Sequence, residues 1–398
     1  MAPSPVLRRG TLLSATLVSL LAVFLGWRFL RPLNIFVVDD TFAWSIRTPV
    51  PEGLTSLRAS ECGQCHQEIY REWSQSIHAR AWTEEYFQAD YAFEGRPYVC
   101  INCHIQLRNQ REFDAVSYRD ADRLEPVLQR NPDFDPELQK EGVTCAVCHV
   151  REGRVIGLHP SDTAPHPVAV KPELLSGMDP CRMCHVASGQ RWDMFYRLPP
   201  CGTVAEIRQG GKEPDCVGCH LPRVTRPSAE GGPLREGGRH LFQGGHHPPQ
   251  VIKALEVAVE RASLGDRERV TFTLTNVGTD HRLPTGTPDR HLTLELRLLA
   301  ADGTVLDQDL HVMRRSVMWR PFIVDLWDTR LLPRQPRAFH FEFDPNRSPA
   351  PAALEAVVRY HLLDEARRRR IAYQNTAPIH YPVWQRRIPL TAAAGGNG

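Results

Sequence analysis

The C-terminal part of the chain alternates between apolar and polar residues with a period of two. Five such segments lie between residues 251 and 390, and residues 302–303 (Asp-Gly) give a hairpin signal after the third. Alternating side chains point to opposite faces of a strand, so we predict an all-β sandwich over residues 251–390. The apolar positions are Leu255, Val257 and Val259; Val270, Phe272 and Leu274; Leu292, Leu294, Leu296 and Leu298; Phe339, Phe341 and Phe343; Leu354, Ala356, Val358 and Tyr360.

The N-terminal segment has a different pattern, an apolar stretch over residues 12–27 that is followed by Arg28. It is short for a membrane-spanning helix of ~20 residues, but Trp27 and a snorkelling Arg28 extend it. A cleaved signal peptide is the alternative, and the small-x-small cleavage site that it needs is not found. We therefore predict that residues 1–34 form a single transmembrane helix that anchors the chain.

The remaining segments show neither period clearly. Residues 35–57 contain Pro49, Pro51 and Gly53 close together, which predicts a linker, and residues 391–398 are expected to form a disordered tail. Glycine pairs at residues 231–232, 237–238 and 244–245 predict loop structure near the end of the middle part.

Ten of the 11 cysteines fall into five copies of Cys-x-x-Cys-His, the pattern by which haem c is attached to a protein. Two thiols three positions apart reach the two vinyl-derived carbons of the porphyrin, and the adjacent histidine binds the iron as its proximal ligand. Zinc sites and disulfides were weighed as alternatives, and five identical triplets fit neither. We predict five covalent haems c, with attachment through Cys62, Cys65, Cys100, Cys103, Cys145, Cys148, Cys181, Cys184, Cys216 and Cys219 and proximal ligands His66, His104, His149, His185 and His220.

The motifs recur every 35 to 45 residues, too densely for an apolar core to form between them. We therefore predict that residues 58–250 form an α-helical or irregular pentahaem cytochrome domain in which the haems are the core. Because haem c is attached outside the cytoplasmic membrane, this domain and the sandwich are expected in the periplasm. The net charge of +2 gives no reason to expect a nucleic-acid partner, and residues 367–370 (RRRR) are expected in a solvated strand or turn.

The sixth ligand of each iron decides whether a haem transfers electrons or binds a substrate. His78 follows the first motif on a segment with helical spacing, and a helix would place it ~18 Å from His66, so we expect His78 to bind a neighbouring haem. In the proline-rich loop after the third motif we prefer His166 to His159. The other candidates for iron ligands are His240, His246 and His281, with His247 as an alternative to its neighbour.

The other residues that could bind iron have simpler roles. Five histidines lie in strand-like or turn segments and are expected to be structural or at the surface: His291, His311, His340, His361 and His380. Met178 and Met194 could bind iron, but packing is the role we prefer. Cys201 has no partner, so we expect an unpaired, buried thiol.

The blocks of residues 61–66 (ECGQCH), 76–78 (SIH) and 141–149 (EGVTCAVCH) resemble the tetrahaem cytochrome c electron carriers of ammonia oxidisers. These carriers are related in haem arrangement to the octahaem hydroxylamine oxidoreductases. Over residues 58–250, the resemblance implies stacked haem pairs with two histidine ligands on most irons, and His78 and the block from His240 to His246 match ligand positions. This chain departs from the family in its fifth motif, in the sandwich, and in Leu221-Pro222 where a Met-Pro pair would follow the motif.

Electron transfer is the function that these features predict. We expect an anchored pentahaem cytochrome in the bacterial cytoplasmic membrane that passes electrons between redox protein partners, or from a membrane quinol-oxidising complex, in a respiratory chain. The alternative is an oxidoreductase with one five-coordinate haem that acts on small nitrogen or sulfur compounds. Every motif ends in histidine, so the lysine variant of pentahaem nitrite reductases is missing. The sandwich is expected to serve as a docking module.

Overall fold

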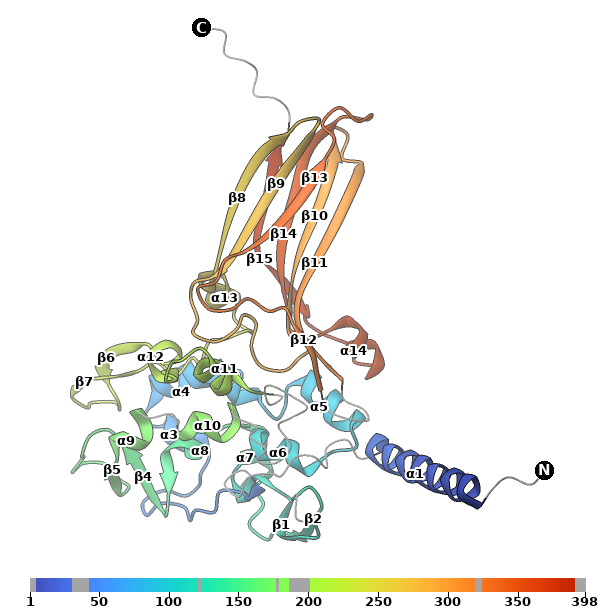
Figure 1. Ribbon diagram of the computed structural model, residues 1–398. Coiled ribbons are helices and arrows are strands. Elements are labelled where there is room, and N and C mark those ends of the chain that lie inside the picture. Colours follow the sequence, from blue (N-terminus) through green and yellow to red (C-terminus); the bar gives the residue numbers. More distant parts are fainter. Residues whose placement is uncertain are drawn as a thin grey trace.

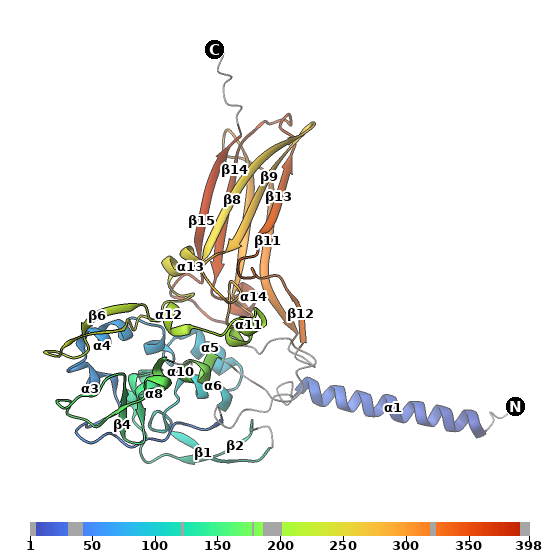
Figure 2. The same cartoon turned by 60° about the vertical axis from the view of Figure 1, so that its left-hand side comes forward.

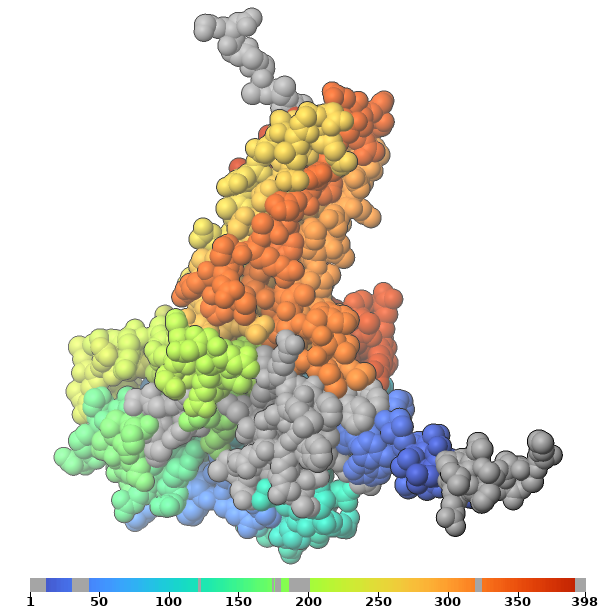
Figure 3. All heavy atoms as spheres, in the orientation of Figure 1, coloured from blue at the N-terminus to red at the C-terminus, as the bar shows by residue number. Residues whose placement is uncertain are grey.

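The structure is a computed structural model that describes residues 5–30, 43–120, 123–176, 179–185, 201–318 and 324–390. Figure 1 shows an upright block of long strands that stands on a rounder part built from short helices. We call residues 43–254 the attachment region and residues 255–390 the strand block. Figure 3 shows that the atoms of the strand block meet those of the attachment region directly at its base.

Helix α1 (Pro5–Leu30) extends away from both regions. Its part Leu12–Leu30 is 19 residues long and apolar enough to cross a membrane. At 1.5 Å per residue this part is about 28 Å long, close to the thickness of a bilayer's hydrocarbon core. An N-terminal signal sequence has the same length and composition, so both interpretations of residues 1–34 remain predictions.

Residues 43–57, which the sequence assigned to a linker, pack against the rest of the attachment region. Ile46 pairs with Leu107, with a hydrogen bond of 2.8 Å from its N–H to the Gln106 carbonyl. Leu57 is buried among apolar side chains near Leu107. Residues 31–42 lie outside the described part of the chain, as does the predicted tail of residues 391–398.

Short helices make up much of the attachment region, and most of the Cys-x-x-Cys-His motifs form one turn or two of helix. This local structure puts the two cysteines of a motif on one helix face, as attachment to one porphyrin requires. The largest apolar cluster described in this region has only six fully buried members, centred on Leu107 and Leu138. The helices are α3 (Ala59–Gly63), α4 (Gln67–Ser74), α5 (Glu85–Phe93), α6 (Tyr98–His104), α7 (Pro136–Lys140), α8 (Cys145–His149), α9 (Pro172–Ser176), α10 (Asp179–His185), α11 (Thr203–Gln209), α12 (Cys216–His220) and α13 (Pro248–Ala254), with 3₁₀ turns η2 (His78–Arg80) and η3 (Arg108–Gln110).

The attachment region also contains three small sheets, which the sequence did not predict. The hairpin of β6 (Arg223–Pro227) and β7 (Leu234–Gly238) replaces part of the loop expected around the glycine pairs, because Gly231 forms its turn with φ +70° while Gly237 and Gly238 are paired in the ladder. The two other sheets join β1 (Phe113–Tyr118) to β2 (Pro126–Arg130), and β3 (Val150–Arg151), β4 (Arg154–Gly157) and β5 (Val168–Val170) to one another.

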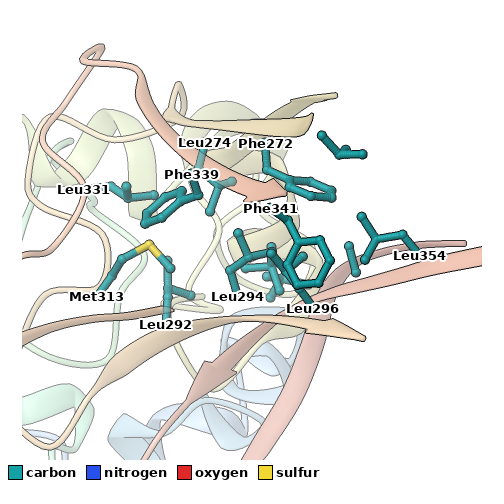
Figure 4. Packing of buried hydrophobic residues seen from close by; sticks show 14 of the residues in the cluster. Phe272, Leu274, Leu292, Leu294, Leu296, Met313, Leu331, Phe339, Phe341 and Leu354 are labelled. Carbon is teal, nitrogen blue, oxygen red and sulfur yellow. The ribbon is translucent and has the colours of Figure 1, made fainter. Parts of the chain in front are cut away.

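The strand block contains two antiparallel sheets, so the strands predicted from the alternation are confirmed. The side chains at the alternating positions of both sheets meet in one apolar cluster, shown in Figure 4, in which Phe272, Leu294 and Leu296 are fully buried. One sheet has the order β12 (Val324–Asp328), β11 (Val305–Met318), β10 (His291–Ala300), β14 (Pro351–His361), β15 (His380–Pro389), and the other β13 (Arg337–Phe343), β9 (Arg267–Asn276), β8 (Leu255–Leu264).

The arginine run at residues 367–370 was expected in a solvated strand or turn, and that expectation is wrong. These residues form α14 (Glu365–Arg370), because the Asp364 carboxylate accepts hydrogen bonds from two N–H groups of its first turn. Arg367 is only 19% exposed and pairs with Asp90 of α5 and with Glu94, which directly follows this helix. This ion pair joins the strand block to the attachment region.

We predict that Leu296→Ala lowers the free energy of unfolding of the strand block by about 3 kcal/mol, because it leaves a cavity at a fully buried position. Leu310→Ala is the control, because Leu310 lies on β11 with 56% of its surface exposed and should change stability by less than about 0.5 kcal/mol. Urea unfolding followed by circular dichroism measures both, and equal effects would contradict the packing in Figure 4.

Candidate haem centres

The attachment cysteines of different motifs lie side by side. Thiols of the first and third motifs interact through Cys62 and Cys145, and those of the second and fourth through Cys103 and Cys184. The fourth and fifth motifs meet in the same way. None of the 11 cysteines forms a disulfide, and the described residues hold no cluster of three or more His, Cys, Asp and Glu side chains that suits a metal ion. The geometry therefore favours separate sites that lie close together.

The fourth motif has the most neighbours among the five. Its Cys181 thiol interacts with Cys216 of the fifth motif and lies near Cys148 of the third. Its Cys184 lies 3.1 Å from the Gln106 amide nitrogen, just after the second motif. The hydrogen bond with the Cys216 thiol, burial and nearby charge together raise the pKa of Cys181 far above its ordinary value.

Hydrogen bonds to backbone carbonyls fix the imidazole rings of four of the five motif histidines. A carbonyl oxygen can only accept, so each of these Nδ1 atoms carries the proton and leaves Nε2 free to bind iron. The carbonyls come from outside the motif helices, between seven and 162 residues along the chain, and these bonds orient the rings. The bonds join His66 to Ser228 (2.6 Å), His149 to Ile156 (3.0 Å), His220 to Gln243 (2.8 Å) and His104 to Ala81.

His78 lies next to the histidine of the fourth motif. The continuous helix predicted from the first motif to His78 is wrong, because α4 ends at Ser74 and His78 opens the separate turn η2. The centres of the His78 and His185 rings are 6.4 Å apart at 52°. Phe242 lies against His78 with ring centres 4.5 Å apart.

His240 lies next to the histidine of the third motif. The centres of the His240 and His149 rings are 6.1 Å apart, and His240 Nδ1 donates to the Gly238 carbonyl at 3.0 Å. The backbone N–H of His240 donates to the carboxylate of Glu72 at 2.9 Å. Burial opposes ionisation of Glu72, but hydrogen bonds from Arg226 and His240 lower its pKa to about 2.

These ring separations fit haem ligation. A histidine nitrogen lies ~2 Å from a bound metal ion and its ring centre about 1 Å further away, so two imidazoles on opposite sides of one iron have centres roughly 6 to 6.5 Å apart. Both measured pairs match this separation, and the Nδ1–H of His149 and of His240 donates to a carbonyl.

Two other candidate ligands also lie near motif histidines. His166 is close enough to His66 for charge on one ring to affect the other, and burial with this neighbour lowers the pKa of His166. His281 has the same relation to His220, and its Nδ1 donates to the Arg282 carbonyl at 2.9 Å. The alternative to His166 in its loop, His159, is exposed.

His246 lies beside an arginine instead of a motif histidine. Its Nε2 accepts a hydrogen bond from Arg290 at 3.3 Å, and burial together with Arg290 and Arg80 lowers its pKa to about 3. Its neighbour His247 lies 3.1 Å from the Gln243 amide nitrogen. A hydrogen bond joins the loop that contains both histidines to the strand block, because the Tyr381 hydroxyl donates to the Gly245 carbonyl at 2.5 Å.

The histidine of the second motif has a different neighbour. The Phe87 ring stacks on His104 with centres 3.4 Å apart at 9°, and Phe87 also stacks on Tyr91. No histidine has a ring contact with His104 among the described residues. Sequence reasoning missed Phe87, because an aromatic residue on α5 carries no signal for the ring it touches. Cys201 lies partly buried near Cys103 of the same motif.

The remaining candidates lie elsewhere. Met178 and Met194 fall outside the described residues. His291 and His361 stack with ring centres 4.1 Å apart on neighbouring strands. All five histidines that were expected to be structural or at the surface lie on strands of the strand block: His291 on β10, His311 on β11, His340 on β13, His361 on β14 and His380 on β15.

Comparisons with known proteins agree with haem attachment. A family model described as cytochrome c554 and c-prime matches residues 61–150. No curated protein matches the chain. The crystal structure of a penta-haem cytochrome c552 from Thermochromatium tepidum is similar, with a TM-score of 0.62 and 20% identity over 85% of this chain and 100% of that one.

Two glycosidase structures overlap 34% of this chain. They are a putative β-galactosidase from Bacteroides fragilis (12% identity, 15% of that chain, TM-score 0.18) and β-glucosidase 3B from Thermotoga neapolitana in complex with glycerol (14%, 16%, 0.13). They carry no argument about this chain. The family match over residues 61–150 and the five motifs support a multihaem c-type cytochrome with covalently bound haem, and such cytochromes in general transfer electrons with redox protein partners.

We predict that Glu72→Gln destabilises the attachment region by about 3 kcal/mol, because it removes one partner of a buried ion pair with Arg226 and weakens the bond to the His240 backbone. Glu68→Gln is the matched control, since Glu68 is 60% exposed and lies 3.6 Å from the same arginine. Denaturant unfolding compares the variants. If both lost the same stability, the ion pair with Glu72 would not hold this segment.

Proposed function

We propose that this chain is an electron carrier with five covalently attached haems c, bound through the ten motif cysteines. The observation that supports this proposal is that four of the five motif histidines lie near a second histidine from a distant part of the chain. The proposed axial pairs are His66 with His166, His149 with His240, His185 with His78, and His220 with His281.

Two histidines on one iron leave no axial position for a substrate, and the haem then supplies one-electron chemistry only. The residues of the chain keep each pair in place. Backbone carbonyl groups outside the motifs accept the Nδ1–H of His66, His149 and His220, which keeps each Nε2 aimed at the iron position. His78 and His240 are partly buried, which limits the access of water to both rings.

The contacts between motifs support a branched route for electrons. The first motif touches the third, and the third lies beside the fourth through Cys148 and Cys181. The fourth touches both the second and the fifth. Electrons that enter at the first haem would pass through the third to the fourth, and from there either to the second or to the fifth. The resemblance to tetrahaem carriers of ammonia oxidisers implies stacked pairs of haems. The contacts of the first motif with the third and of the third with the fourth fit such pairs.

The proposed setting is the periplasmic side of the bacterial cytoplasmic membrane. Helix α1 has the length and composition of a single-pass anchor, and haem c is attached outside that membrane. The proposed units are an anchor over residues 1–34, a pentahaem domain over residues 58–250 and a β-sandwich over residues 251–390. The partners would be periplasmic redox proteins or a membrane quinol-oxidising complex of a respiratory chain, and no nucleic acid.

One observation favours a second candidate function. His104 stacks on Phe87 and has no histidine ring near it among the described residues. If no other residue supplies its sixth ligand, a haem at this motif keeps one axial position for a small ligand. The second candidate is therefore an oxidoreductase that acts on small nitrogen or sulfur compounds at the second motif.

We expect the mature protein to carry five haems. Intact mass and the pyridine haemochrome assay measure this number. The double variant Cys181→Ala with Cys184→Ala should carry four, because both thioether bonds of one haem are lost. Cys201→Ala should keep five. A mature protein with four haems would refute the proposed count.

Spin state separates the two functions. His240→Ala should convert one low-spin haem into a high-spin haem that binds cyanide, as seen by electron paramagnetic resonance, because it opens one axial position. His159→Ala, at an exposed histidine of the attachment region, is the control and should leave the spectrum unchanged. A high-spin haem in the unaltered protein that binds cyanide and turns over nitrite or hydroxylamine would replace the carrier with the second candidate.

A further inference from the structure

The segment that carries His281 connects strands β9 and β10 at the base of the strand block, next to α11 and α12 (Figures 1 and 2). Backbone bonds hold it to its own side. The Asn276 amide donates to the His281 carbonyl at 2.8 Å, and Leu283 and Leu331 exchange two N–H···O bonds. These bonds attach the segment to the strand block and leave its position relative to the attachment region to other groups.

Glu206 of α11 supplies the link across the two regions. Its Oε2 accepts hydrogen bonds from the Arg282 N–H at 3.1 Å and from the Thr285 hydroxyl at 2.8 Å. Its Oε1 accepts from Arg330 at 2.7 Å. The side chains of Glu206 and Arg330 are 1% and 2% exposed, so this is a buried ion pair.

The buried pair belongs to a small network. Asp328 binds Arg330 at 2.7 Å and Arg282 at 3.1 Å. Arg330 also donates to the Pro284 carbonyl at 3.1 Å. The loop on both sides of His281 is therefore fixed by groups whose charges are matched within the network.

The other end of the link lies near His220. The helix that carries Glu206 is followed along the chain by α12, which ends at His220. Lys212, between these helices, pairs with Asp280 at 2.6 Å, although both side chains are exposed and the pair contributes little. Holding Glu206 against Arg282 thus sets the position of His281 relative to His220.

We propose that Glu206 is a positioning residue that holds His281 at the iron of the haem attached by the fifth motif. This inference rests on the proposed pairing of His220 with His281. Because breaking a buried ion pair leaves an unpaired charge, loss of the Glu206 carboxylate favours a shift of the whole loop. The strand block would then control the ligation of a haem that it does not attach.

The test uses the full-length holoprotein and carbon monoxide, which binds reduced haems that lack a sixth ligand. Glu206→Gln should raise the carbon monoxide bound by the reduced protein by about one molecule per chain above the wild-type value. In the oxidised protein it should reduce the low-spin electron paramagnetic resonance signal by the share of one haem. His281→Ala should do the same. Glu94→Gln is the matched control, because Glu94 pairs with Arg367 across the same two regions at 2.6 Å without touching the His281 loop.

A milder pair of variants covers the case in which Glu206→Gln fails to assemble. Thr285→Val removes one donor to Glu206, and Thr285→Ser keeps it. The valine variant should bind more carbon monoxide than the serine variant, which should equal wild type.

The outcomes that overturn the proposal are distinct. If His281→Ala adds a carbon monoxide site and a fully haem-loaded Glu206→Gln does not, Glu206 does not position the ligand. The same conclusion follows if the two Thr285 variants bind equally. If His281→Ala adds no site, the pairing of His220 with His281 is wrong, and the inference falls with that part of the proposed function.

Discussion

The separation between opposed histidine rings is the constraint on which the attachment region depends. The region has short helices and small apolar clusters, so apolar burial alone gives little to fix one segment against another. The ring centres of His78 and His185 are separated by the distance expected for two imidazoles on opposite sides of one iron, although the residues come from distant segments. The hydrogen bonds at Nδ1, the buried carboxylate of Glu72 and the close thiols all act to keep such rings in place.

The strand block is part of this arrangement. Tyr381 forms a hydrogen bond with the loop that carries His246. Arg367 forms an ion pair with Asp90 of α5, and Arg330 forms one with Glu206. Each contact joins a strand or helix near the base of the block to a segment close to a haem motif. These bonds join the strand block to the segments that carry the haem motifs, which fits a supporting role for the block beside the expected docking role.

Local sequence patterns were enough to predict some features. The haem motifs are local because two thiols and a histidine must reach one porphyrin, and the strands are local because alternation follows from the geometry of the strand. The structure places His78, His240, His166 and His281 near motif histidines, and their role as iron ligands stays a prediction. Their partners could not be assigned from the sequence, since the pairing joins segments far apart along the chain.

The misses share a physical cause. The β6–β7 hairpin was hidden because glycines weaken the alternation on which a strand prediction relies. The packing of residues 43–57 and the ion pairs of Arg367 and Glu206 arise from tertiary contacts that leave no local pattern. His246 was chosen as a ligand from its place in a glycine-rich loop, and the structure places Arg290 beside it.

The order of the proposed ligands along the chain has a consequence for maturation. In three pairs the second histidine comes after its motif, and only His78 precedes the motif histidine that it faces, His185. If the chain is exported from its N-terminus, as proposed, most irons would receive their second ligand from residues that arrive later. Each closure also acts as a reversible cross-link, which for a loop of ~100 residues lowers the entropy of the unfolded chain by an amount worth about 4 to 5 kcal/mol. The final closure, at His281, would complete the molecule only once the first strands of the block have emerged.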